Sequence, residues 1–85
     1  MHEFDLRDEI PIEADIIEIY AMVKPATGSI EVRRSPDDDQ PLVMWAGMRT
    51  SIGVPVGRKL YVSSSPFTKE FKLFVAGWLG DRVKQ

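Results

Sequence analysis

The sequence predicts an all-β protein, a small antiparallel β-sandwich or barrel of five to six strands with an extended N-terminal arm. Three observations support this fold class. Apolar and polar residues alternate with a period of two, the alternating segments are short, and Pro and Gly separate them. A chain of 85 residues makes one domain. We divide it into an arm (1–12), a single β domain (13–79) and a C-terminal tail (80–85).

The first strand of the domain is predicted at Ile16–Lys24, which is rich in β-branched residues. As a strand, it presents one apolar face made of Ile17, Ile19, Ala21 and Val23. A helix is the alternative for this segment and would stack Ile16, Ile19, Tyr20 and Val23. The strand is favoured because Pro25–Gly28 supplies turn residues and Ser29–Arg34 alternates again, as in a hairpin.

Three further strands are predicted in the middle of the chain, after a loop at Ser35–Gln40. Leu42–Met48 is the most continuously apolar run, so we expect Trp45 at its centre to be buried. Ser51–Val56 alternates through its three β-branched apolar residues, and its Gly and Pro indicate a bulged or edge strand. Lys59–Ser63 has an inward face made of Leu60 and Val62.

The last element has two interpretations. Glu70–Trp78 alternates as a strand, with Phe71, Leu73 and Val75 on one face and Lys72, Phe74 and Trp78 on the other. Pro66–Leu79 also carries helix signals, namely a Ser-Pro start and a glycine after the end. The strand is favoured because Gly77 and the aromatic residues weaken a helix.

Charge divides unevenly along the chain. Residues 1–40 hold eleven acidic and four basic residues, and residues 41–85 hold two acidic and seven basic residues. The formal charges are therefore −7 and +5, which sum to the net −2 of the chain. Such a division predicts head-to-tail complementarity between copies or with a partner.

No residue pattern points to a reaction. The chain has no cysteine, which excludes disulfides, thiolate metal sites and cysteine nucleophiles. Its single histidine, His2, is expected in a mobile terminus, where it could not serve as a general base. Asp37–Asp39 lacks the alternation of a calcium loop and is predicted as a solvated acidic turn, with a weak cation site as the alternative. We expect no enzymatic activity, catalytic residue, cofactor or metal.

Basic and aromatic residues interleave in the second half of the chain, as in proteins that bind single-stranded nucleic acid. A sequence pI of about 5.3 argues against a dedicated nucleic-acid module. No signal peptide and no apolar run long enough for a membrane span is apparent. Nucleic acid and membrane are therefore not the expected partners.

Three stretches of the chain together resemble a known family in their order of strands and turns. Asp15–Val32 forms a hairpin pattern, Val54–Val62 is an apolar stretch containing Pro-Val-Gly, and Phe71–Trp78 is a closing strand. Together they look like the small all-β structural proteins of tailed bacteriophage virions, which are capsid decoration or cement proteins and tail or neck components. In such families, function resides in oligomer contacts and terminal arms, so the resemblance implies no catalytic residues.

The sequence therefore predicts a non-enzymatic virion or assembly protein, made in the host cytoplasm, that acts as a homo-oligomer or on a capsid or tail lattice. The alternative is a small inhibitor or adaptor that binds a host protein or single-stranded nucleic acid through a charged face. We expect the arm to lie on the basic face of the next copy, or to fold back on its own domain. The candidate contact residues are Phe4, Leu6, Asp8, Glu9, Arg49, Arg58, Lys59, Lys69 and Lys72.

Overall fold

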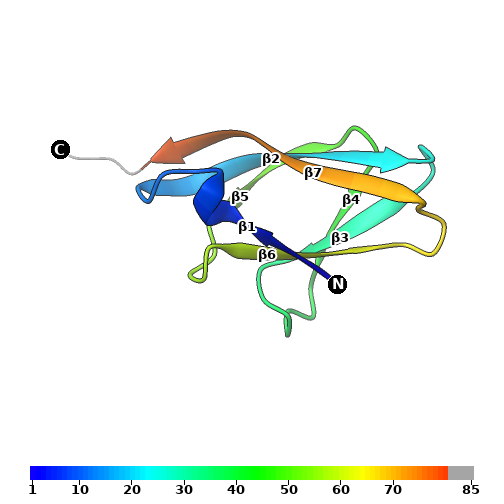
Figure 1. Ribbon diagram of the computed structural model, residues 1–85, viewed down its shortest axis with the longest axis horizontal. Coiled ribbons are helices and arrows are strands. Elements are labelled where there is room, and N and C mark those ends of the chain that lie inside the picture. The colour runs from blue at the N-terminus through cyan, green and yellow to red at the C-terminus, as the bar shows by residue number, and fades with distance from the viewer. Residues whose placement is uncertain (81–85) are drawn as a thin grey trace.

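The computed structural model describes residues 1–80, which form seven antiparallel strands in two facing sheets (Figure 1). The strands are β1 (His2–Asp5), β2 (Ala14–Lys24), β3 (Ser29–Arg33), β4 (Leu42–Trp45), β5 (Arg49–Gly53), β6 (Lys59–Ser64) and β7 (Glu70–Gly80). A 3₁₀ turn, η1 (Leu6–Asp8), follows β1. The predicted all-β antiparallel class is confirmed. The strands number seven rather than five to six, and the sheets form an open sandwich rather than a closed barrel.

The three-stranded sheet has the order β5-β2-β7. Its central strand β2 buries the alternate residues that the sequence predicted, Ile17, Ile19, Ala21 and Val23. The strand β7 pairs with β2 from Glu70 to Gly80, with register shifts between the pairs Ala14–Gly80 and Ile16–Leu79 and between the pairs Glu18–Gly77 and Ile19–Val75. Both segments for which a helix was the alternative are therefore strands.

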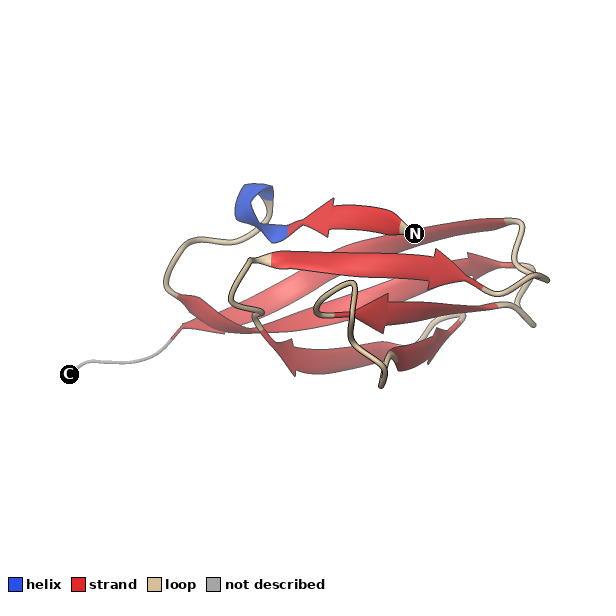
Figure 2. Cartoon of the chain, turned by 90° about the horizontal axis from the view of Figure 1, so that it is seen from below, coloured by secondary structure: helices blue, strands red, loops and turns tan. Residues whose placement is uncertain are grey.

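The four-stranded sheet has the order β1-β6-β3-β4. Its inward residues alternate as predicted in β3 and β6, where Ile30, Val32, Leu60 and Val62 are all buried. Together with β2 they fill the space between the two sheets, because alternate side chains of each strand point to the same face. In the view of Figure 2, β1 lies at one margin of the molecule and η1 continues from it.

The N-terminal segment is not an extended arm, because it forms part of the domain. The strand β1 pairs with β6 from His2–Val62 to Asp5–Lys59. Leu6 is 0% exposed and Ile10 is buried beside it, whereas Ile12 is 83% exposed. The sequence could not reveal this strand because its partner lies about sixty residues further along the chain.

Trp45 is the clearest error of the sequence prediction. It is 55% exposed, while the preceding residue Met44 is 0% exposed and belongs to the core. The run Leu42–Trp45 is an edge strand with apolar residues on both faces, so the alternation is invisible in its composition. The strand stops at Trp45 because a turn follows, in which Gly47 has a φ of 81° that favours glycine.

Two other boundaries differ from the predictions. The strand expected at Ser51–Val56 lies at Arg49–Gly53, and Val56, expected inside, is fully exposed in the turn before β6. Gly80, expected as the first residue of the tail, is the last residue of β7. The rest of the predicted tail, 81–85, lies outside the described residues.

Candidate functional site

The N-terminal residues that were candidates for partner contacts divide into buried and exposed ones. Leu6 is in the core, and Phe4 is half-buried against it. Asp8 and Glu9 are exposed. The segment thus takes the second of the two positions considered for it, folded back on its own domain, because its apolar side chains supply part of the core.

Arg58 and Lys59 hold the N-terminal segment in place. The Arg58 guanidinium donates hydrogen bonds to the carbonyl oxygens of Pro11 at 2.7 Å and Ile12 at 3.4 Å. The Lys59 ammonium lies 3.0 Å from the Glu3 carboxylate, and this hydrogen bond raises the pKa of Lys59. Both cations therefore have partners within the domain.

The remaining candidate cations lie elsewhere. Arg49, on the edge strand β5, is 3.7 Å from the Glu18 carboxylate and lies over the ring of Tyr20 at 5.5 Å. Lys72 lies over the ring of Phe74 at 5.7 Å. Lys69 is in the turn between β6 and β7, at the end of β6 opposite to Arg58 and Lys59. The structure therefore does not gather the five candidate cations on one surface.

The division of charge along the sequence is not a division in space. The pairs Glu3–Lys59 and Glu18–Arg49 each join an acidic residue of the first half to a basic residue of the second. Antiparallel pairing of β1 with β6 and of β2 with β5 brings these residues to diagonal positions on neighbouring strands. Much of the complementarity predicted between copies is thus used within one copy.

The N-terminal acidic residues include an ion pair that the sequence analysis missed. The guanidinium of Arg7 donates to both carboxylate oxygens of Asp5, at 3.0 Å and 2.7 Å, and the Arg7 backbone N–H donates at 2.9 Å. These hydrogen bonds lower the pKa of Asp5 from 3.8 to about 2. The spacing of two residues across the end of a strand could have indicated this pair.

His2 and the acidic turn each have contacts within the domain. His2 belongs to β1, and its ring packs edge-on against Phe71 at 5.3 Å. Asp38 accepts hydrogen bonds from the backbone N–H groups of Gln40 at 3.0 Å and Arg34 at 3.4 Å, which lower its pKa. Within residues 1–80, no three Asp, Glu or His side chains come together in a way that could hold a metal ion.

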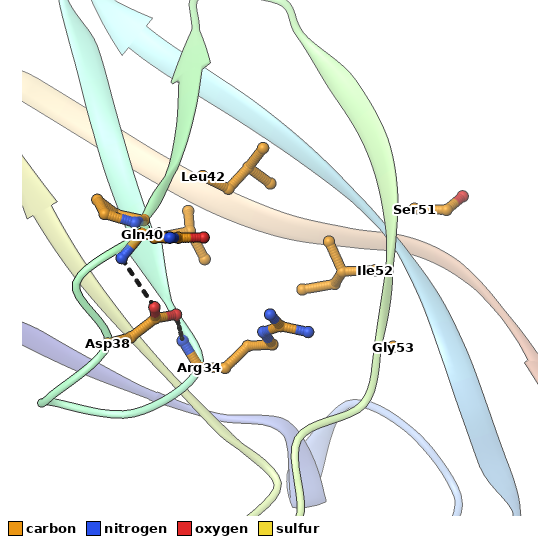
Figure 3. Close-up of a pocket in the computed structure, with 9 residues that line it drawn as sticks. Arg34, Asp38, Gln40, Leu42, Ser51, Ile52 and Gly53 are labelled. Carbon is orange, nitrogen blue, oxygen red and sulfur yellow. Dashed lines mark hydrogen bonds between the residues drawn. The ribbon is translucent and has the colours of Figure 1, made fainter.

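A cavity of about 410 Å³ opens between β4 and β5, where the two sheets diverge (Figure 3). Leu42 and Ile52 supply apolar walls, and Arg34 reaches from the β3–β4 loop toward Ile52. Ser51 points away from the cavity, and both oxygens of Asp38 are engaged by its own loop. The lining of the cavity therefore offers one cation, Arg34, and apolar contacts. These groups suit binding rather than proton transfer.

The most extensive exposed apolar surface lies on the three-stranded sheet. Phe74 is 40% exposed, Trp78 is 45% exposed and Leu79 is 67% exposed, although all three belong to β7. The neighbouring strand β2 adds Tyr20, opposite Phe74, and Ile16, opposite Leu79. Trp78 is paired with Ile17, which is 0% exposed, so it lies on the inner face of the sheet near the end of β7, whereas the other four lie on the outer face. We call these five residues the β7 patch: Ile16, Tyr20, Phe74, Trp78 and Leu79. Beside it is a shallow hollow of about 300 Å³ lined in part by Ile16, Trp78 and Leu79.

The β7 patch was absent from the predicted contact residues. A signal for part of it existed, because Phe74 was assigned to the face opposite Phe71 and Leu73, so both faces of this strand are apolar. Only one of them can face the core of a two-layer sandwich. The assignment of Trp78 to the face of Phe74 was wrong, because the bulge at Ala76 shifts the alternation and pairs Trp78 with the buried Ile17.

Comparisons of the chain with protein-family models, with curated proteins and with solved structures find no match. In the described part of the chain, no helix has the length and apolar character needed to cross a membrane.

Proposed function

We propose that this chain is a non-enzymatic structural or assembly protein that acts through contacts with copies of itself or with a protein lattice. The observation that carries the proposal is the β7 patch. Single exposed apolar residues are ordinary on protein surfaces, but several of them at neighbouring positions of two paired strands are typical of an interaction site. Aromatic side chains such as Phe74 and Trp78 are also the type enriched at the centres of interfaces.

The particular role we propose is that of a bacteriophage virion component, such as a capsid decoration, cement, tail or neck protein. The support is the all-β architecture together with the resemblance in style carried by Asp15–Val32, Val54–Val62 and Phe71–Trp78. The protein would be made in the host cytoplasm and end in the virion. The alternative, an inhibitor or adaptor with a charged binding face, has less support because Arg49, Arg58 and Lys59 have partners within the domain.

Particle association tests this role. Cells that produce virions would carry the wild-type chain or the variant Trp78→Ser, each with the same epitope tag, and particles would be purified by density gradient. We expect the wild-type chain in the particles at fixed stoichiometry and less of the variant. The substitution Ile12→Ser is the matched control, since Ile12 is exposed but lies outside the β7 patch. A chain found only in the soluble fraction contradicts the virion role.

A further inference from the structure

The free edge of β7 is the longest unpaired strand edge in the molecule. Among the strands of residues 1–80, β7 pairs with β2 alone, and it runs for 11 residues. The other three edge strands are shorter: β1 and β4 have 4 residues each and β5 has 5. An unpaired edge presents a row of N–H and C=O groups that can hydrogen-bond to a further strand.

The second half of β7 lacks the charges and the proline that often protect such an edge. Edge strands are commonly protected by charged residues, by proline, by a bulge or by shortness. From Leu73 to Gly80, β7 has no charged residue and no proline, and its two charges, Glu70 and Lys72, both lie at its beginning. The pairing of β7 with β2 has two irregularities, and the bulge at Ala76 is the protective feature in this part of the strand. This edge therefore has the composition of a strand that pairs.

We infer that β7 pairs with β7 of a second copy, in antiparallel orientation, so that two three-stranded sheets join into one six-stranded sheet. The inference rests on the proposed function for its use in assembly, because it names the partner of that same surface. Hydrogen bonds of the strand edges would supply direction, and burial of Phe74, Trp78 and Leu79 would supply much of the stabilisation.

The distribution of charge along β7 selects the antiparallel orientation. In that orientation the charged beginning of one strand, with Glu70 and Lys72, lies beside the uncharged end of the other, at Trp78–Gly80. In a parallel orientation Lys72 of one copy would lie near Lys72 of the other, and like charges on adjacent strands are destabilising. The charge distribution of one β7 edge is thus complementary to that of the same edge in a second, antiparallel copy.

The first test measures the mass of the particle in solution. Sedimentation over a wide range of concentration should give twice the mass of the chain at high concentration. Phe74→Lys should weaken the dimer at least about tenfold, because it places a charge on the joined sheet. Phe67→Lys is the matched control, since Phe67 is exposed in the turn before β7, and its dimer should persist. A monomer at all concentrations overturns the inference, as does an equal effect of the two variants.

The second test measures orientation and does not depend on the lysine variants folding well. The chain has no cysteine, so single-cysteine variants report one position each. Ala76→Cys lies near the middle of β7, where two antiparallel copies meet, and should cross-link to its mate with a short bismaleimide. In full-length antiparallel pairing, Lys72→Cys would be about 20 Å from its mate, so it should cross-link poorly. Equal cross-linking at both positions indicates parallel pairing, and none at Ala76→Cys indicates another interface; either overturns the inference.

These measurements need no virion, so they separate the two proposals. A dimer joined at Ala76→Cys that never enters particles supports the pairing and contradicts the virion role. A chain that enters particles but remains monomeric in solution, without cross-linking, contradicts the pairing and leaves the virion role supported. A β7 edge occupied by a strand of a different protein would give this second pattern.

Discussion

The strands β1 and β7 are the edges of opposite sheets on the same side of the sandwich, yet they differ in almost every respect. The strand β1 has 4 residues, and β7 has 11. The edge of β1 is charged, because Glu3 pairs with Lys59 and Asp5 pairs with Arg7. The second half of β7 has no charged side chain at all. The two strands approach each other at their beginnings, where the ring of His2 packs against Phe71.

The two strands therefore have two kinds of unpaired edge, one protected by charged residues and one without them. The ion pairs of β1 are exposed and contribute little to stability, but they make its edge a poor template for another strand. The edge of β7 carries no such protection and is flanked by aromatic side chains. We therefore expect β1 to matter for the stability of one copy and β7 to matter for contacts between copies, and the following predictions test this contrast.

Deletion of residues 1–9 should have the largest effect. It removes β1, leaves an edge of β6 without its partner and removes Leu6 from the core. Because a domain of this size has only a small margin of stability, we expect loss of cooperative thermal unfolding in circular dichroism. An unchanged melting temperature would show that β1 contributes nothing to the fold and would abolish the contrast with β7.

Leu6→Ala should cost about 2–5 kcal/mol of unfolding free energy, because Leu6 is completely buried and its removal leaves a cavity. Urea denaturation measures this value. Ile12→Ala, a few residues away at an exposed position, is the matched control and should change stability by less than about 0.5 kcal/mol. Equal effects of the two substitutions would mean that the 3₁₀ turn does not dock on the core.

Trp45→Ala should cost less than about 1 kcal/mol, well below the 3–5 kcal/mol expected for a buried tryptophan. The reason is that Trp45 lies on the outer face of the edge strand β4, and Met44 fills the core instead. Urea denaturation of Trp45→Ala beside Met44→Ala sharpens the comparison, because Met44→Ala should be the more destabilising. A larger loss of unfolding free energy for Trp45→Ala than for Met44→Ala would show that Trp45 is buried in the core.

The smallest effect expected is on pH dependence. In the folded state, hydrogen bonds from Arg7 hold the pKa of Asp5 at about 2, below its ordinary 3.8. Asp5 therefore contributes stability above pH 3.8, and this contribution is lost as the pH falls toward 2. We expect the stability of Asp5→Asn to fall less steeply than that of the wild type over this range. Parallel pH curves would contradict the Asp5–Arg7 contact.

Much of the fold was predictable because the period-2 alternation is local. In β2, β3 and β6 one face is apolar over at least two residues, and these faces are the ones that the structure buries. Trp45 was misplaced because both faces of its strand are apolar, so no alternation marks the buried one. β1 was missed because strand pairing over sixty residues leaves no local signal when the strand has 4 residues.

The candidate contact residues were less predictable. The charged candidates were chosen from the uneven distribution of charge along the sequence. Antiparallel pairing places Glu3 beside Lys59 and Glu18 beside Arg49, so these charges have partners within the domain. Exposure of Phe74 and Trp78 depends on which face of β7 meets the other sheet, and which edge of β7 stays unpaired depends on sheet order. Sheet order has no signal in the spacing of residues along the chain.

The strand pairing also sets the order in which the molecule can be completed during synthesis. The strand β2 can pair with β5 early in synthesis, but its pairing with β7 joins Ala14 to Gly80. The strand β1 cannot pair until β6 has been made. Closing such long loops makes folding slow compared with that of helical domains of the same size. Until β7 emerges, one edge of the apolar strand β2 has no partner in this chain. A newly made copy therefore passes through a stage in which the unpaired edge belongs to β2, and in the finished protein it belongs to β7.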